Sequence, residues 1–391
     1  MAAKAKKLFD TSSDANKLKT LRDIVVPPQQ ITGEFVPIHI PQIDRVLGGG
    51  VLTGKMLEIY GDMHSGKTTL GLKVVKAFLD YFPSKAVIWI DIEHAFSPKW
   101  ASINGVDQND ERFIIKQTDD IELTLMEVSR AVETLPGTIS LVVIDSVAAM
   151  KPKENWLDAK PSENPYDSNA IGSHARFLAQ VLPRFVPLCS NQNVTILALN
   201  QARTNMGRGM AYTDSTGGRA MKHYVSYKLE LRPSMIFKHD EAYDVSIREG
   251  IRVKVFCNKN RFGQPYMQEE FVINPSHGLS YVDNVVEFAI AHGIVETRGS
   301  WFNYTYSVKD RDGNAVEKQC KAQGSKAFLE VIRTTVEAYR HLLDHVYDSL
   351  MFDLENAYDF DYEPHLDGGD GNEQKAEADG KEQIEISEVV S

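Results

Sequence analysis

Residues 56–82 read MLEIYGDMHSGKTTLGLKVVKAFLDYF. The first five are mostly apolar and predict a strand, and residues 68–82 predict a helix that stops at Pro83. Between the two, residues 61–68 match the pattern G-x-x-x-x-G-K-[ST] at every position. A strand, this loop and a helix in that order are the context in which the pattern binds nucleotide phosphates. The alternative interpretation is a glycine turn with a surface lysine.

The chemistry of the loop explains why these residue types are needed. Glycines let backbone N–H groups wrap phosphate oxygens, and the N-terminus of the following helix adds a favourable dipole. We expect Lys67 to reach the β and γ phosphates and the hydroxyl of Thr68 to bind Mg²⁺. The predicted nucleotide-binding set is Gly61, Asp62, Met63, His64, Ser65, Gly66, Lys67, Thr68 and Thr69.

Further apolar runs predict the rest of the fold. Nearly continuous apolar strands are typical of a parallel sheet that is buried on both faces. The sequence has four more of them: AVIWID (86–91), FIIK (113–116), ISLVVID (139–145) and VTILALN (194–200). We expect helices between them at about 119–134 and 171–188. Later segments alternate apolar and polar residues and suggest an antiparallel extension: 223–232, 250–257 and 266–274. The predicted fold class is α/β.

Two acidic residues follow predicted strands and complete the expected nucleotide site. Asp145 ends the strand 139–145 and is expected to hold the metal through water. Glu93 lies just past the strand 86–91, at the edge where open α/β sheets bind ligands. It is expected to orient or deprotonate the attacking water. The alternatives are that Asp145 caps the next helix and that Glu93 is a surface charge.

The chain divides into four predicted parts. The first is a short helix followed by a linker with Pro27, Pro28 and Gly33, and the second is the nucleotide-binding core. A small α/β unit with helices at 283–292 and 325–351 follows, and the chain ends in an acidic tail. The predicted bounds are 1–37, 38–280, 281–351 and 352–391.

The charge is concentrated in the tail. The net charge of the chain is −11, and residues 353–391 alone hold 13 Asp or Glu and two Lys. The remaining chain therefore has 41 acidic and 41 basic residues and no net charge. The polar tail is expected to be disordered.

Composition excludes several classes of protein. No run of 18 apolar residues is present, so we expect no membrane-spanning helix. The basic start MAAKAKKLFD has no apolar segment after it and does not predict a secretory signal. Cys189, Cys257 and Cys320 are far apart, which fits a reducing cytoplasm and predicts neither disulfides nor a zinc site.

Six motifs, in order and spacing, carry a resemblance to a known family. They are GDMHSGKTTL, WIDIEHAFSP, LVVIDSVAAMKP, LALNQART, STGGRAMKHYVS and KNRFGQPYMQEEF. Over residues 38–304 the chain resembles the RecA family of recombinases. Its lengthened loops are similar to those of phage-encoded members such as the UvsX group, for which host cytoplasm is the expected location.

The resemblance implies a RecA-type P-loop ATPase that binds ATP and Mg²⁺. It implies a helical homo-oligomer on single-stranded DNA, with ATP between neighbouring protomers, that pairs with duplex DNA and exchanges strands in recombination and repair. By position, Glu93 is the catalytic base, Trp100 stacks on adenine, and Gln201 senses the γ-phosphate. The N-terminal helix is expected to contact a neighbouring protomer.

Two loops are expected to face the DNA, at about 151–173 and 202–218. Cations supply salt-dependent phosphate contacts, and apolar or aromatic side chains can stack on bases or wedge between them. The alternative for the second loop is a surface lid. Its predicted DNA-binding residues are Arg203, Met206, Arg208, Met210, Tyr212, Gly217 and Gly218.

The chain departs from the family pattern at the protomer interface. The family's pair of lysines acting across that interface falls on Lys259 and Arg261 when KNRFGQPY is aligned as a block, which we favour. Aligned from the upstream strand, the pair falls on Cys257 and Lys259. His223 occupies the place of the family's aromatic interface residue.

Two other functions are compatible with a RecA-type core: a hexameric DNA helicase and an ATP-dependent DNA clamp. The helicase would need a large N-terminal domain, for which 37 residues leave no room. The clamp predicts loss of the acid at Glu93, which is present. The acidic tail either aids solubility, competes with DNA for a basic site, or docks a single-strand-binding protein or loader.

Overall fold

The computed structural model describes residues 33–150, 173–206, 211–240, 245–309, 313–350 and 388–389. The predicted N-terminal helix, nearly all of the first predicted DNA loop, Arg208, Met210 and most of the acidic tail lie outside these residues. The elements named below belong to the compact unit Phe35–Ser391.

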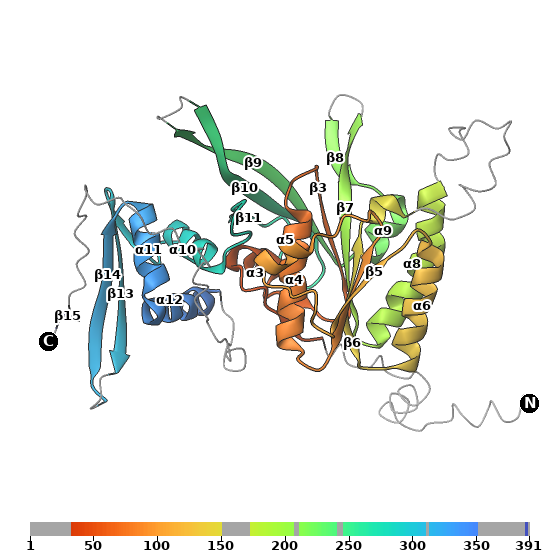
Figure 1. The fold of residues 1–391 in the computed structure, drawn as a ribbon, viewed down its shortest axis with the longest axis horizontal. Helices are drawn as coiled ribbons and strands as arrows, with labels where there is room; N and C mark the ends of the chain where they lie inside the picture. The colour runs from red at the N-terminus through yellow and green to blue at the C-terminus, as the bar shows by residue number, and fades with distance from the viewer. Residues whose placement is uncertain are drawn as a thin grey trace, which may run out of the picture. The chain divides into compact units, whose positions relative to one another are not determined.

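A mixed sheet forms the centre of the fold (Figure 1). In spatial order its strands are β11 (Gln268–Ile273), β10 (Val245–Asn260), β9 (Tyr227–Asp240), β3 (Met56–Gly61), β7 (Thr195–Met206), β6 (Ile139–Asp145), β4 (Ala86–Asp91) and β5 (Phe113–Gln117), and β8 (Ala211–Ser215) pairs with β7. Pairing is parallel from β9 through β5 and antiparallel from β9 to β10 and β11. The predicted parallel sheet with an antiparallel extension is confirmed.

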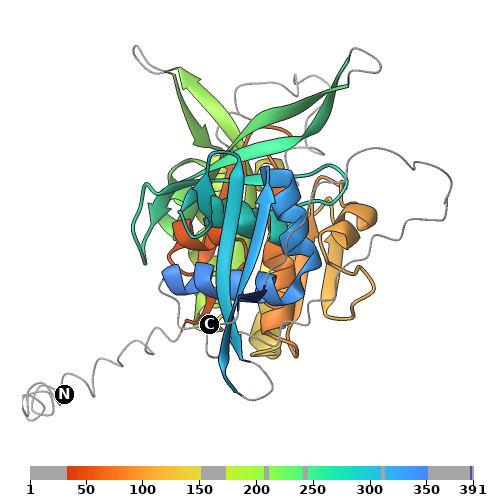
Figure 2. The same cartoon turned by 90° about the vertical axis from the view of Figure 1, so that its left-hand side faces the viewer.

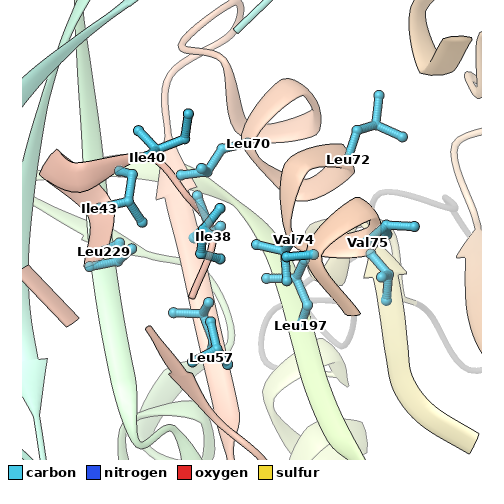
Figure 3. Packing of buried hydrophobic residues seen from close by; sticks show 14 of the residues in the cluster. Ile38, Ile40, Ile43, Leu57, Leu70, Leu72, Val74, Val75, Leu197 and Leu229 are labelled. Atoms are coloured by element: carbon cyan, nitrogen blue, oxygen red, sulfur yellow. The ribbon is translucent and has the colours of Figure 1, made fainter. Parts of the chain in front are cut away.

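Alternation along the central strands buries both faces of the sheet. In β6, Leu141 and Val143 belong to one apolar cluster, and Val142 and Ile144 belong to another on the opposite face. The first cluster is covered by α3 (Pro41–Leu47), α4 (Lys67–Tyr81) and α5 (Pro98–Ile103), and the second by α6 (Ile121–Thr134), α8 (Ser173–Asn191) and the end of α9 (Gly218–Tyr224). Figure 3 shows part of the first cluster, including side chains from α3, α4, β3 and β7. The sheet is therefore a rigid platform for residues at its strand ends.

Residues after β11 form a third apolar cluster. The unit contains α10 (Tyr281–Ala291), β12 (Glu296–Arg298), β13 (Trp301–Lys309), β14 (Ala315–Gln323), α11 (Ser325–Thr334) and α12 (Val336–Ser349). Figure 2 shows β13 and β14 as a long hairpin beside α11 and α12. Hydrogen bonds from Tyr347 to Asp44 (2.5 Å) and from Gln42 to the carbonyl of Asn284 (2.8 Å) join this unit to α3.

Smaller elements complete the described chain. β1 (Phe35–Val36) pairs with β2 (Val51–Leu52), and a 3₁₀ turn η1 (Val147–Ala149) follows β6. Within the acidic tail, β15 (Glu388–Val389) pairs antiparallel with β14.

The structure differs from the sequence-based expectation at three places. The predicted helix 325–351 is two helices, because Thr334, Thr335 and Val336 are consecutive β-branched residues and Thr335 adopts non-helical torsion angles. The predicted strand 223–232 begins only at Tyr227, since the preceding residues belong to α9. The segment 202–218, expected to be a loop, contains the antiparallel pair β7–β8 instead, with β-forming Thr and Tyr along it.

Candidate active site

The phosphate loop follows the carboxyl end of β3, and β3 is an interior strand that lies between β9 and β7. Gly61 ends the strand and Lys67 begins α4. Gly66 has a φ of 91°, and a Cβ placed there would lie 2.4 Å from Cδ1 of Ile273. The left-handed φ therefore favours glycine at this position, and it gives the loop the tight curvature that lets its N–H groups surround an anion.

Lys67 folds back over its own loop. Its Nζ donates to the carbonyl oxygens of Gly61 (3.0 Å) and Asp62 (2.7 Å). Burial lowers the pKa of this amine, while the nearby carboxylates of Asp145, Glu93 and Asp62 oppose the shift. The half-buried ammonium therefore lies in the loop that would hold the phosphates, bonded to neutral oxygens that an anionic oxygen can replace.

Acidic side chains converge on the same edge of the sheet. Burial raises the pKa of Asp145 to about 7, and Glu93 and Asp91 add to the shift, whereas Lys67 opposes it. The carboxylates of Asp145, Glu93 and Asp62 act on a single lysine, and this excess of negative charge favours an additional cation. One or two carboxylates, a hydroxyl and substrate phosphates are the usual ligands of Mg²⁺, so Asp145 and Thr68 fit that ion.

Glu93 connects two neighbouring strand ends. Its Oε1 accepts a hydrogen bond from the hydroxyl of Ser146, the residue after β6, and Nε2 of Gln201 on β7 lies 3.4 Å away. Strand order explains the convergence, because β7, β6 and β4 are adjacent and parallel. Glu93 is exposed, which is compatible with its predicted contact with the attacking water.

Two residues of the site were missed by sequence reasoning. Ser146 directly follows Asp145, and this position was the one feature of the sequence that could have indicated its role. Asp91 accepts hydrogen bonds from the backbone N–H groups of Ala95 and Phe96 (both 3.1 Å) and from Gln117 (3.0 Å). It thereby fixes the turn that contains Glu93. Its position as the last residue of β4 was the only feature of the sequence that could have indicated this role.

Trp100 borders the phosphate loop. Its Nε1 donates to the hydroxyl of Thr69 over 3.0 Å, and Ser97 accepts from the backbone N–H of Trp100 (3.3 Å) at the start of α5. The indole is partly buried, beside the first turn of α4. This position is compatible with the predicted contact to a nucleotide base.

Lys259 and Arg261 do not join this set. In the sheet, Lys259 of β10 is opposite Lys228 of β9, and Lys228 is opposite Glu58 near the start of β3. The phosphate loop follows the other end of β3, so Lys259 lies away from it. Nζ of Lys259 donates to the carbonyl of Lys222 and Nη2 of Arg261 to that of His223, each over 2.6 Å. Both cations hold the last turn of α9, where carbonyls lack helical partners.

The predicted DNA-binding residues that are described lie on or beside the β7–β8 hairpin. Arg203 is exposed and lies opposite Asp214, while Met206 and Tyr212 lie farther along the paired strands. Gly217 has a φ of 107° and leads into α9, and a Cβ there would lie 2.5 Å from Cγ of Met221. This glycine is thus required by the backbone. Gly218 follows it with a φ of 68°.

Among the helices of the described ranges, none is long and apolar enough to cross a membrane. Comparison with known proteins gives a consistent result over most of the chain. The family described as RecA N-terminal domain matches residues 32–280. Protein RecA of Chlamydia caviae is 32% identical over 308 residues, which cover 78% of this chain and 80% of that protein. Protein RecA of Chlamydia felis is 32% identical over 291 residues (74% and 78%), and that of Chlamydia muridarum is 31% identical over 310 residues (79% and 80%).

Proposed function

This chain belongs to the RecA family, and we infer from that membership and from its site that it is an ATP-dependent DNA recombinase acting in recombination and repair. It is a DNA-dependent ATPase of the RecA type. The observation that carries the assignment to particular residues is the convergence of Lys67, Asp145, Glu93 and Gln201 at adjacent strand ends. We also propose that it acts in the cytoplasm, because the relatives named above are bacterial proteins and bacterial DNA lies in the cytoplasm.

Residues of the phosphate loop bind the triphosphate of ATP in this proposal. Lys67 exchanges the carbonyls of Gly61 and Asp62 for β and γ phosphate oxygens, which are better partners for an ammonium because they are charged. Thr68 and, through a water molecule, Asp145 would hold Mg²⁺, and the ion would neutralise phosphate charge. Trp100 contacts the adenine.

Glu93 acts as the general base of hydrolysis. Ser146 donates to Oε1 and fixes the carboxylate, and the exposed side of Glu93 takes the proton of the attacking water. Gln201 contacts the same oxygen and lies on β7, which continues into the hairpin. A shift of its amide from Glu93 to the γ-phosphate would report the presence of ATP to that hairpin.

Lys259 and Arg261 complete the ATP site of a neighbouring protomer. This part of the proposal is supported by their position beside α9, away from the phosphate loop of their own chain. Arginine is well suited to stabilising charge that develops during phosphoryl transfer. The protein then works as a helical homo-oligomer, with the β7–β8 hairpin near single-stranded DNA and a second, duplex DNA as exchange partner.

One experiment tests this function against the alternatives. The full chain is mixed with ATP, Mg²⁺ and single-stranded DNA, and filaments are imaged while strand exchange with homologous duplex DNA is measured. We expect helical filaments and ATP-dependent exchange, both reduced when ATP is omitted. Closed rings that unwind duplex DNA would instead show a helicase, and DNA binding without exchange would show a clamp.

A further inference from the structure

A network of charged side chains lies beneath the β7–β8 hairpin. Lys228 of β9 contacts Asp214 of β8 over 2.5 Å and lies 3.9 Å from Glu58 of β3. Lys222 of α9 contacts the other carboxylate oxygen of Asp214 over 2.6 Å. The side chains of Glu58, Lys228 and Asp214 are only 1%, 10% and 15% exposed. Charges this deeply placed are strongly destabilising when unpaired, so they hold one another's positions.

The network reaches the ATP site on one side. Asn200 donates to Glu58 (2.7 Å) and to the carbonyl of Thr216 (2.8 Å), just after β8. Its own Oδ1 accepts from the backbone N–H of Gln201 over 2.9 Å. Gln201 is the residue whose side chain contacts Glu93. A continuous set of polar contacts therefore runs from the proposed general base to the base of the hairpin.

On the other side the network reaches the cations proposed to act in trans. Lys222 uses its side chain to bind Asp214 and its carbonyl to accept from Lys259. The next carbonyl, that of His223, accepts from Arg261. Because α9 spans only Gly218–Tyr224, the contact of Lys222 with Asp214 anchors its last turn. Asp214 therefore ties the position of these cations to the position of β8.

Asp214 also lies beside a residue that is predicted to contact DNA. It lies directly opposite Arg203 in the antiparallel β7–β8 pair. Residues opposite each other in such a pair place their side chains on the same face of the ribbon. A phosphate that attracts Arg203 would therefore act on the strand pair that contains Asp214.

We propose that Asp214 is a positioning residue that couples DNA contact at the β7–β8 hairpin to the placement of Lys259 and Arg261. It touches neither nucleotide nor DNA in this proposal. It holds α9, through Lys222, in a fixed relation to the hairpin, so that DNA binding sets the cations for the neighbouring ATP. The inference rests on the proposed function, and it predicts that the network matters for DNA-stimulated hydrolysis and not for the basal rate.

Two substitutions interrupt the coupling at different points. Asp214→Asn keeps the size of the side chain but removes the charge that both lysines share, and Lys228 retains Glu58 as a partner. Lys222→Met removes the outer contact to Asp214, at a side chain that is 55% exposed, and leaves the Asp214–Lys228 pair in place. Glu127→Gln is the matched control, because it breaks the exposed Lys116–Glu127 pair (3.0 Å) away from the hairpin.

The measurements are ATP hydrolysis with and without single-stranded DNA, DNA affinity and thermal unfolding of the full chain. In Asp214→Asn and Lys222→Met we expect DNA-stimulated kcat to fall about tenfold, within the usual range of coupling between sites. The rate of hydrolysis without DNA and the affinity for DNA should each change by less than about twofold, which is small beside the usual coupling between sites. The double variant should be no worse than the more severe single one, since both interrupt one path. Asp214→Glu should recover part of the stimulation.

The outcomes separate this inference from the function on which it rests. A natural protein whose hydrolysis is not stimulated by DNA would contradict the proposed function itself. A stimulated natural protein, together with equally stimulated Asp214→Asn and Lys222→Met variants, would overturn the inference alone. If Asp214→Asn proves unfolded by circular dichroism, Lys222→Met decides the matter. An equal loss in Glu127→Gln would also overturn it, because the effect would then be general destabilisation.

Discussion

Nε2 of Gln201 lies 3.4 Å from Oε1 of Glu93, across 108 residues of sequence. This distance is beyond the ordinary range for an N–H···O hydrogen bond, so the contact is weak. The stronger hydrogen bond to the same oxygen comes from Ser146. Glu93 is thus fixed by one partner while Gln201 remains able to change its contact when a γ-phosphate arrives.

Substitution of Glu93 by glutamine tests its role as the base. Glu93→Gln should bind ATP with near-normal affinity, because the phosphate loop is untouched. Its hydrolysis should be slower by roughly 10²–10⁴, the usual contribution of general base catalysis. Single-turnover hydrolysis and nucleotide binding measure the two effects separately. The exposed acid Glu111 provides the control through Glu111→Gln, and normal turnover in Glu93→Gln would refute the assignment.

Substitution of Lys67 should affect binding as well as turnover. Lys67→Ala removes the cation that lies over the phosphate loop, so nucleotide affinity falls and hydrolysis is abolished. Isothermal titration with ATP and Mg²⁺, together with phosphate release, provides the measurement. Lys76→Ala on the same helix, which removes a surface pair with Asp80, should behave like the natural protein. ATP hydrolysis at a near-normal rate in Lys67→Ala would place the site elsewhere.

Mixing two inactive variants tests whether Arg261 acts in trans. In an assembly of Arg261→Ala and Glu93→Gln protomers, one type of mixed interface contains neither defect, because Arg261 and Glu93 come from different chains. Some DNA-dependent hydrolysis should therefore return on mixing, with a maximum at intermediate ratios. The rate is compared with the sum of the two parents at the same total concentration. Rates that never exceed that sum would contradict a site shared between protomers.

The raised pKa of Asp145 predicts a pH dependence of stability in the protein without nucleotide. Its folded-state pKa of about 7 is above the ordinary value of 3.8, chiefly because of burial. The folded state then binds more protons than the unfolded state between these values, so the contribution of Asp145 to the free energy of unfolding falls as pH rises from about 4 to about 7. Asp145→Asn should therefore be more stable than the natural protein at pH values above about 7, and this advantage should vanish towards pH 4.

Urea unfolding at several pH values measures that difference. The same substitution at the exposed Asp107, whose carboxylate accepts hydrogen bonds from the backbone and side chain of Asn109, should leave the pH profile unchanged. A constant difference between Asp145→Asn and the natural protein at every pH would contradict the prediction.

Removal of the acidic tail tests its effect on duplex DNA. Truncation after residue 351 removes a net charge of −11 and leaves a core without net charge. Repulsion of DNA should then fall, so that duplex DNA binds faster and more tightly at low salt. The gain should shrink as the Debye length falls towards ~8 Å at physiological ionic strength. If the full-length and truncated proteins bind duplex DNA equally at low salt, the tail does not compete with DNA, and its role is docking or solubility.

The sequence predicted those parts of the structure that depend on local pattern. Strands such as Ala86–Asp91 and Ile139–Asp145 were predicted to the residue, because continuous apolar runs bounded by polar residues have one compact solution. The helix containing His223 was missed, since GRAMKHY has no long apolar period. The contacts of Ser146 with Glu93 and of Asp214 with Lys222 and Lys228 depend on which strands are neighbours, and a local pattern does not contain that information.

The separation of Lys259 and Arg261 from the phosphate loop of their own chain has a consequence for the ends of an assembly. When each ATP site is completed by the next protomer, a row of n protomers holds n−1 complete sites, because a head-to-tail contact leaves each end open. One terminal protomer then holds ATP without the two cations, and the opposite one presents cations without a nucleotide to meet. The protomer at the first end would hydrolyse its ATP most slowly, because it lacks the two cations. The protomer at the second end could bind a further protomer that carries ATP. Protomers would therefore be added and lost in different ways at the two ends, although every contact within the assembly is the same.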